Sequence, residues 1–366
     1  MTTKDLHKQP FSEETITKLD IFEKYLESWL PVAIQSPFVA EVNICDFFAG
    51  IGRDIKGIDG SPLRIIKTIK KFEDTILKQN LRIHVLFNEY TLTKCQQLRD
   101  CIEKEREALK DLENNLSIEI LNEDFKELFV SKKPLLENHF NLFFLDQSGI
   151  KQITEEIFLD LTKFHKTDFM FFISSSVFKR FASDTSFQKY FPDMDPQAVS
   201  VTNHTEMHRL ILQYYKGKIP NESQLKLYPF TIKKGRNIYG LIFGSNHPLG
   251  IEKFLKIAWE TNELNGEANF DIDEDWKSAQ MLLFGSRKLS KKEKFQLELE
   301  EFILSKNEFS NKEVCDFTLE NGHIINNALP VIKKLVAKSK ISYTGHHNIS
   351  YNKCYKSKEI KKFKVL

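Results

Sequence analysis

Short apolar runs alternate with helical segments along the first part of the chain. The runs cover residues 42–49, 83–87, 118–121, 142–145 and 168–173, and apolar residues at helical spacing separate them. Nearly continuous apolar strands that alternate with helices are typical of a parallel sheet with both faces buried. The pattern therefore predicts parallel strands in βα alternation.

The last two apolar runs, residues 225–232 and 238–243, are separated by a very short polar connection. Such a connection permits an antiparallel hairpin but no parallel crossover. A parallel sheet closed by a hairpin, with the last strand inserted antiparallel between the fifth and sixth, is the architecture of class I methyltransferases. We therefore expect an α/β, class I methyltransferase-like Rossmann domain over residues 41–275, containing a seven-stranded sheet.

The segments that flank this sheet are helical in pattern. Residues 13–34 carry apolar side chains at helical spacing, so residues 1–40 are expected to form N-terminal helices that pack on the core. Residues 61–77 and 249–259 predict further helices, with Ser61 as a helix cap. Residues 262–275 are polar and acidic, which favours a linker.

The C-terminal part predicts a small separate domain. Ser310 and Glu313 fit a capping box, and a tight turn precedes the last predicted helix. The expected helices cover residues 291–305, 312–320 and 324–337, and the expected wing strands cover residues 341–343 and 348–355. This order predicts a winged helix-turn-helix-like domain at residues 286–345, a module that binds nucleic acid or docks protein. Residues 346–366 are expected to form a basic tail.

Composition and charge narrow the class of protein. Apolar residues at 41% and charged residues at 28% are ordinary for a globular chain, and a formal net charge of +2 excludes a histone-like polycation. The charge is uneven, because residues 337–366 hold eight lysines and one acid, a net charge of +7. Such a block is either a solvated tail or a polyanion-binding arm.

The spacing of the cysteines indicates whether a metal site is expected, and the apolar runs indicate the cellular location. Cys45, Cys95, Cys101, Cys315 and Cys354 are scattered singly, with no spacing typical of metal ligands, so we expect no metal. No apolar run approaches the roughly 20 residues of a membrane span, and the first residues contain no signal core. We expect a cytoplasmic protein that does not bind a membrane.

Cofactor-binding candidates follow the first two predicted strands. Ligands of open α/β sheets bind beyond the carboxyl ends of the strands. A glycine-rich segment follows the first strand, and its candidate residues are Asp46, Phe48, Ala49, Gly50 and Gly52. Its glycines would let the backbone approach a ligand closely. Glu89 follows the second strand and is placed to accept hydrogen bonds from both ribose hydroxyls; a surface carboxylate is the alternative.

Further candidates follow the third and fourth strands. Asp124 would receive the amino group of an adenine while Phe125 packs against the ring, although a helix cap explains Asp124 nearly as well. Asp146 occupies the position from which amino-methyltransferases present an Asp/Asn-Pro-Pro-aromatic tetrapeptide to the target nitrogen. The prolines and the aromatic are missing here, so Asp146 is a catalytic candidate with a ligand-orienting carboxylate as the alternative. These strand ends together predict S-adenosylmethionine as the cofactor.

Several cations are candidates for contact with nucleic acid. Arg53 and Lys56 lie in an insertion after the glycine segment, which is either a substrate loop or a plain surface loop. Lys179 and Arg180 follow the fifth strand, and Lys338 and Lys340 begin the basic block. Lysine and arginine at such positions would contact phosphates rather than read bases.

Four segments carry a resemblance to a known family. They are FAGIG at residues 48–52 with GSPL at residues 60–63, LFFLDQSG at 142–149, DFMFFISSSVFKRF at 168–181, and residues 232–258. With these segments the chain resembles the three-Cys-motif partner proteins of bacteria, over roughly residues 20–275. The resemblance implies a methyltransferase-like protein with a partner that carries a three-cysteine motif reminiscent of radical S-adenosylmethionine enzymes, in a phage-related or mobile-element setting. The family usually has Asp-Pro-aromatic-Gly where this chain has Asp146-Gln147-Ser148-Gly149.

Two functions follow as hypotheses. The first is an S-adenosylmethionine-dependent methyltransferase that acts on DNA or RNA. The second is a catalytically inactive nucleic-acid-binding or adaptor subunit, which the missing prolines and aromatic after Asp146 favour. The sequence predicts neither the methylated atom nor the oligomeric state.

Overall fold

A computed structural model describes residues 10–147, 149–203, 206–234, 237–273, 289–342 and 349–366. The chain divides into two compact units, Met1–His247 and Pro248–Leu366, and each is described by itself. The domain boundary expected at residue 275 lies within residues 274–288, which are outside the described residues, and it stays a prediction.

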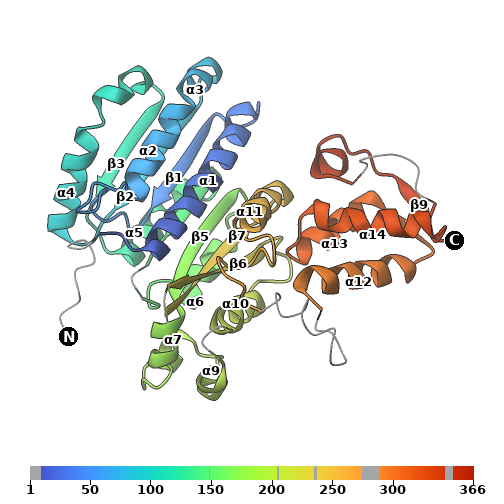
Figure 1. The fold of residues 1–366 in the computed structure, drawn as a ribbon. Helices are drawn as coiled ribbons and strands as arrows, with labels where there is room; N and C mark the ends of the chain where they lie inside the picture. The colour runs from blue at the N-terminus through green and yellow to red at the C-terminus, as the bar shows by residue number, and fades with distance from the viewer. Residues whose placement is uncertain (1–9, 148, 204–205, 235–236, 274–288, 343–348) are drawn as a thin grey trace. The chain divides into compact units, whose positions relative to one another are not determined.

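The first unit contains a seven-stranded sheet with the order β3-β2-β1-β4-β5-β7-β6 (Figure 1). The first five strands in the chain pair in parallel, and β7 pairs antiparallel with both β5 and β6. This confirms the mostly parallel sheet and its antiparallel hairpin end. The strands are β1 (Glu41–Asp46), β2 (Arg82–Asn88), β3 (Leu116–Leu121), β4 (Phe140–Leu145), β5 (Thr167–Ser174), β6 (Lys226–Lys234) and β7 (Asn237–Ser245).

Helices connect these strands and cover the sheet. They are α1 (Glu13–Gln35), α2 (Ser61–Lys71), α3 (Glu73–Gln79), α4 (Leu92–Glu103), the 3₁₀ helix η2 (Glu107–Leu112), α5 (Phe125–Leu136), α6 (Glu155–Leu161), α7 (Ser175–Phe181), α8 (Phe187–Tyr190), α9 (Pro196–Val201) and α10 (Met207–Gly217). The single helix expected at residues 61–77 is two helices that meet at Phe72. Its N-cap is Gly60 and not Ser61, which is the first helical residue.

Helix α1 packs one aromatic face onto the sheet. Its buried residues recur at helical spacing, so that Phe22 stacks on Phe144 of β4 at 4.1 Å and Trp29 stacks on Phe140 at 4.8 Å. Burying whole aromatic rings is a large apolar contribution to stability. The N-terminal helix is therefore an integral part of the unit, and in Figure 1 it lies beside α2 in front of the strands.

The opposite face of the sheet is also aromatic. Side chains alternate along β4, so Phe143 faces away from α1 and meets Phe164 edge to face at 5.4 Å. Phe129 of α5 contacts the same pair of rings. The high phenylalanine content, 31 residues, thus supplies a two-sided core.

The second unit is mainly helical. Ser290 and Ser310 each form a capping box, with Glu293 and Glu313 respectively, and the second of these boxes was expected. Strands β8 and β9 pair antiparallel, and an isolated bridge joins Ile341 to Val365. The elements are α11 (Pro248–Thr261), α12 (Lys291–Leu304), β8 (Glu308–Ser310), α13 (Asn311–Glu320), α14 (Ile325–Ala337), the π-helix η5 (Asn352–Lys356) and β9 (Lys362–Lys364).

The expected wing strand at residues 348–355 is wrong in its described part. Residues 352–356 form η5, and the strand that completes the small sheet is β9. Side-chain contacts hold η5 on α13, because the thiols of Cys315 and Cys354 hydrogen-bond each other and the Tyr355 hydroxyl donates to Asp316. Residues 343–348 lie outside the described residues.

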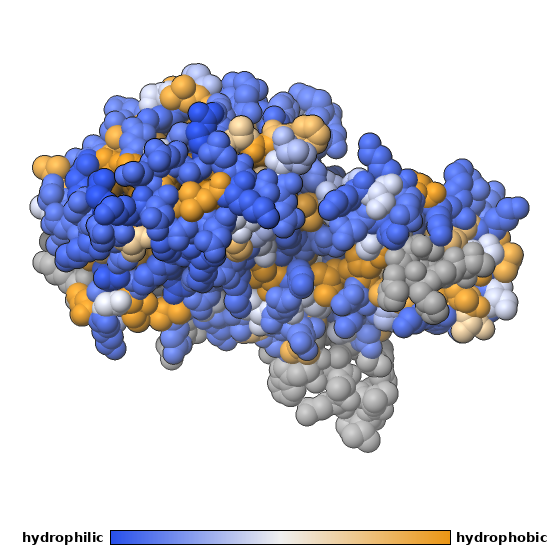
Figure 2. Space-filling model, turned by 90° about the horizontal axis from the view of Figure 1, so that it is seen from above, coloured by the Kyte–Doolittle hydropathy of each residue, from blue (hydrophilic) through white to orange (hydrophobic). Residues whose placement is uncertain are grey.

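The surface is polar over most of the face that Figure 2 shows, with separate hydrophobic areas between the charged side chains. Among the described residues, no helix combines the length and the apolar character that crossing a bilayer would require.

Candidate functional site

The carboxyl ends of β2, β1 and β4 lie side by side because these strands are neighbours and run parallel. In register, Asp46 pairs with Phe87 of β2 on one side and with Phe144 of β4 on the other. The residues that follow the three strands, Asp46, Glu89 and Asp146, therefore share one edge of the sheet.

The glycine segment turns sharply after β1. Gly50 and Gly52 adopt φ values of 65° and 86°, a left-handed region that glycine enters without a steric cost. A Cβ on Gly52 would also lie 3.0 Å from the Sγ of Cys101. Backbone conformation and close packing thus both require glycine at position 52. Ala49 is buried, and its N–H donates to the carbonyl of Asn88 at 2.9 Å.

Glu89 joins the glycine segment to the end of β2. Its Oε2 accepts from the backbone N–H of Gly50 at 3.2 Å, and its Oε1 accepts from the N–H of Thr91 at 2.8 Å. The carboxylate is half-buried and sits directly beside the glycine turn. Each carboxylate oxygen thus already accepts one backbone N–H, and contact of Glu89 with ribose hydroxyls stays a prediction.

Asn88 organises the edge and was missed in the sequence. Its Nδ2 donates to the carbonyls of Phe47 and Glu123 at 3.4 and 3.1 Å, and its Oδ1 accepts from the Glu123 N–H at 3.0 Å. One buried side chain therefore ties together the segments that follow β1 and β3. Nothing in the sequence indicated that Asn88 would be buried, because an asparagine at the end of a strand usually indicates only a turn.

Asp46 is a fully buried carboxylate. Its Oδ1 accepts from the backbone N–H of Phe48 at 3.1 Å, while its Oδ2 has no hydrogen-bond partner among the described residues. Burial raises the pKa of Asp46 to about 7, and the Ser61 hydroxyl and the Phe48 N–H offset this only in part. The nearby Asp146 raises the pKa further and Lys18 lowers it. A buried acceptor oxygen without a donor is costly in a protein core and favours a ligand that supplies one.

Asp146 is paired with a residue of the N-terminal helix. The ammonium of Lys18 donates to Asp146 Oδ2 and lies 4.8 Å from the centroid of the Phe172 ring. The two side chains are 16% and 26% exposed, so the pair is shielded but open to solvent on one side. Lys18 lies in an amphipathic helix more than a hundred residues away in sequence, which is why no local motif pointed to it.

Gln147 orders the loop after Asp146. It is buried, its Nε2 donates to the Phe172 carbonyl at 3.1 Å, and its Oε1 accepts from the N–H groups of Gln152 and Ile153 at 3.0 and 3.3 Å. The loop is thus closed on itself and fastened to β5. Gly149 has a φ of 115°, and Ser148 lies outside the described residues.

Asp124 caps helix α5. Its Oδ1 accepts from the N–H groups of Lys126 and Glu127 at 2.9 and 3.4 Å, which is the helix-cap alternative noted in the sequence. Phe125 is 3% exposed, and Phe48 is half-buried with its ring 4.9 Å from that of Phe125. Phe125 also packs on Phe47 at 5.5 Å. Contact of these residues with an adenine stays a prediction.

The insertion after the glycine segment is a small closed loop. Arg53 bridges to Asp59 at 2.8 Å and to Glu105 at 2.9 Å, so its guanidinium is already engaged by acids. Asp54 accepts from the N–H groups of Phe11, Lys56 and Ile58. Lys56 is exposed at the tip of the loop.

The remaining predicted cations fall into two groups. In α7, Lys179 donates to the Thr202 carbonyl at 2.6 Å, and Arg180 is exposed, with its Nε donating to the Ser176 carbonyl at 3.3 Å. Lys338 and Lys340 are exposed in the second unit, at and after the end of α14. Contact of any of them with nucleic acid stays a prediction.

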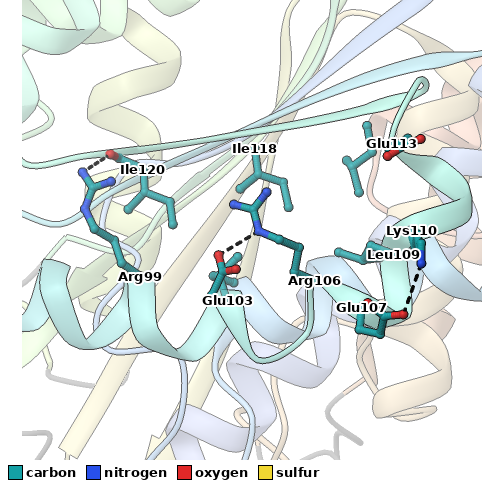
Figure 3. Close-up of a pocket in the computed structure, with 11 residues that line it drawn as sticks. Arg99, Glu103, Arg106, Glu107, Leu109, Lys110, Glu113, Ile118 and Ile120 are labelled. Carbon is teal, nitrogen blue, oxygen red and sulfur yellow. Dashed lines mark hydrogen bonds and ion pairs between the residues drawn. The ribbon is translucent and has the colours of Figure 1, made fainter.

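A pocket of about 610 Å³ lies elsewhere in the first unit (Figure 3). Side chains of α4, η2 and β3 line it, with Ile118 and Ile120 on one side and Arg99 and Arg106 among its charged groups. None of the predicted site residues contributes to its lining, so it is separate from the strand-end edge.

Among the residues that the structure describes, no group of three or more potential ligands gathers to hold a metal. No family model matches the chain, and no curated protein matches it.

Proposed function

We propose that the protein is an S-adenosylmethionine-dependent methyltransferase that acts on nucleic acid. The observation that carries the proposal is the fully buried carboxyl group of Asp46, whose hydrogen-bond donors are the Phe48 N–H and the Ser61 hydroxyl, and whose Oδ2 has no well-formed hydrogen bond among the described residues, beside a turn with two glycines of positive φ. An ammonium group is the donor that such an oxygen favours most, because it supplies both a hydrogen bond and the opposite charge.

The strand order supports this choice of fold family. An antiparallel β7 inserted between β5 and β6 distinguishes class I methyltransferases from ordinary dinucleotide-binding Rossmann domains, and it is the arrangement of this sheet. Fold alone does not fix function, so the proposal rests on the strand-end residues.

The residues present fit the proposed cofactor. Asp46 would bind the ammonium of its amino-acid end, and Glu89 would accept hydrogen bonds from the ribose hydroxyls. Both bonds to the Asp124 side chain go to Oδ1, which leaves Oδ2 for an adenine amino group. When bound, S-adenosylmethionine supplies an electrophilic methyl group on a sulfonium.

Asp146 would orient the acceptor nitrogen. Lys18 bonds to its Oδ2, so Oδ1 remains to accept a hydrogen bond from an N–H of the acceptor. A carboxylate placed in this way polarises the N–H and removes its proton as the new bond forms.

The second unit supports nucleic acid as the acceptor. The elements α12, β8, α13, α14, the Ile341 bridge and β9 follow one another in an order that would fit a winged helix with α14 as its recognition helix, although η5 stands where a wing strand was expected. Lys338 and Lys340 are exposed at the end of α14 and would bind phosphates. A partner protein with a three-cysteine motif belongs to the same proposal through the family resemblance.

Isothermal titration calorimetry on the full chain tests the cofactor. Wild-type protein should bind S-adenosylmethionine and S-adenosylhomocysteine, and Glu89→Gln should weaken both. Glu119→Gln serves as a matched control, because Glu119 lies on β3 and pairs with Lys132 on the surface. Absence of binding at millimolar ligand, or equal weakening by both variants, would contradict the proposal.

An inactive nucleic-acid-binding subunit is the second candidate. It is favoured by the Asp146-Gln147 segment, which lacks the aromatic that stacks a target base. Transfer of a labelled methyl group to cellular RNA or DNA, lost in Asp146→Ala, would exclude it. Cofactor binding without any transfer would favour it.

A further inference from the structure

Two lysines converge on one tyrosine near the strand-end edge. The Nζ of Lys151 lies 5.2 Å from the centroid of the Tyr190 ring, and the Nζ of Lys126 lies 6.0 Å from the same centroid. Lys151 also lies 4.4 Å from the ring of Phe181, which contacts Tyr190 edge to face. Three separate segments, α5, the loop after β4 and the α7–α8 region, build this cluster.

Both lysines belong to the carboxyl edge of the sheet. Lys126 is the second residue of α5, directly after the Asp124 cap that follows β3. Lys151 lies in the loop that begins at Asp146, and Gln147 closes this loop through its bond to the Gln152 N–H. The cluster is therefore held beside the acceptor end of the proposed site.

Neither ammonium is neutralised by an ion pair. Among the described residues, no carboxylate lies within ion-pair distance of Lys126, which is half-buried, or of Lys151, which is exposed. Other half-buried lysines of the first unit do have an acidic partner, among them Lys18, Lys133 and Lys218. Lys151 contributes to the lowered pKa of the exposed Asp184, but the Oδ1 of Asp184 accepts a hydrogen bond from the Ser186 hydroxyl. Two cations held near one ring repel each other, and an anion between them would remove that repulsion.

The rings give the cluster its position. An ammonium over an aromatic face gains a modest attraction and is less free to move than a lysine in water. Lys179, in contrast, is engaged with a backbone carbonyl, and Arg53 with two acids. Lys126 and Lys151 therefore have no acidic or carbonyl partner among the described residues that would compete with a phosphate, and the sequence did not single them out.

We propose that Lys126 and Lys151, positioned by Tyr190, bind a phosphodiester group of the nucleic-acid strand whose base enters the site at Asp146. A phosphodiester carries one negative charge and two free oxygens, so each ammonium can donate to one of them. The inference rests on the proposed function for the class of acceptor. It adds a backbone contact that sets which nucleotide reaches Asp146.

Oligonucleotide binding without cofactor tests this site. Fluorescence anisotropy of a labelled single strand and of its duplex, over a range of KCl concentrations, gives the affinity and its salt dependence. Lys126→Gln and Lys151→Gln should each weaken binding of any sequence. Each should reduce the slope of log K against log salt by about 0.7 for the single strand and about 0.9 for the duplex.

Lys78→Gln is the matched control, because Lys78 is an exposed lysine near the end of α3, at the amino-end side of β2. It makes the same change in charge and should leave both slopes unchanged. Tyr190→Leu, which keeps both charges but removes the ring, should weaken binding less than the double lysine variant.

Equal effects of the control and the two lysine variants would overturn the site, and so would a wild-type protein that binds no oligonucleotide. Either outcome can be distinguished from failure of the proposed cofactor binding, because S-adenosylmethionine binding is measured separately. If the lysine variants weakened oligonucleotide binding as expected but the wild type bound no S-adenosylmethionine, the methyltransferase proposal would be wrong and the phosphate site would be supported.

Discussion

Replacing Asp46 with asparagine removes the fully buried ionisable group of the proposed cofactor site. Asparagine has nearly the same shape and can still accept from the Phe48 N–H, so packing should be preserved. What changes is the pH dependence of the unit's free energy of unfolding, because the asparagine side chain does not ionise. The comparison therefore isolates the consequence of burying this carboxyl group.

The expected magnitude follows from the pKa of Asp46, which burial raises to about 7 from an ordinary 3.8. Between these values the folded protein keeps a proton that the unfolded chain has lost, so the free energy of unfolding falls as pH rises. The full difference corresponds to about 4 kcal/mol, and the part between about pH 5 and about pH 8 is roughly 2.5 kcal/mol. Above about pH 8 the contribution stays constant.

Hydrogen exchange of β1 and β4 amides in the full chain measures this difference. The wild-type pH profile alone does not isolate Asp46, because burial also raises the pKa of Asp168 to about 6, which lowers stability in the same direction as pH rises. The wild type should lose roughly 2.5 kcal/mol more protection than Asp46→Asn between about pH 5 and about pH 8. Parallel pH profiles for the two proteins would refute the buried-acid argument.

The same titration should appear in cofactor binding. An ammonium ligand prefers the ionised carboxylate, so wild-type affinity for S-adenosylmethionine should rise about tenfold between about pH 6 and about pH 8. Asp46→Asn should bind more weakly, and calorimetry should show this pH dependence removed. If the variant retained the wild-type profile, another group would be responsible for it.

Further changes test neighbouring parts of the structure. Gly52→Ala should lower the free energy of unfolding by about 1–3 kcal/mol and by more than Gly57→Ala, because both have a positive φ but only Gly52 faces a close neighbour; equal losses in chemical denaturation would contradict the packing argument. Ser310→Ala should cost the second unit about 1 kcal/mol of stability through its lost capping box, and unchanged exchange in α13 would argue otherwise. Lys18→Met should shift the pH midpoint of cofactor binding upward, because Lys18 lowers the pKa of Asp46; an unmoved midpoint would show that the two do not interact.

The central strands of the sheet were predictable because β4 and β5 are buried on both faces, whereas β3 at the sheet edge contains no buried residue. A strand covered by helices on either side must be apolar at nearly every position, and such runs stand out from the amphipathic helices between them. Because parallel strands have their carboxyl ends at the same edge of the sheet, the polar residues at the ends of these runs are expected to lie along that edge. Asp46, Glu89 and Asp146 follow from this reasoning alone.

Long-range partners were not predictable from the same pattern. Lys18 reaches Asp146 only because α1 packs across β4 through Phe22 and Trp29, and this packing is a property of three-dimensional shape. The break at Phe72 and the replacement of a wing strand by η5 have a similar origin, since tertiary packing decides between conformations that local propensity leaves close in energy.

Gln147 changes how the segment after β4 is interpreted. Prolines in the Asp/Asn-Pro-Pro-aromatic tetrapeptide stiffen the backbone that carries the acid, and here the buried Gln147 side chain stiffens it by hydrogen bonds to the Phe172 carbonyl and to two N–H groups of its own loop. The loss of the prolines is therefore compensated, and the carboxylate of Asp146 sits on an ordered loop. What the segment lacks is an aromatic surface for a base. If the protein acts on nucleic acid as proposed, a nucleotide whose base reached Asp146 would be positioned largely through its phosphodiester backbone, which is the role proposed for Lys126 and Lys151.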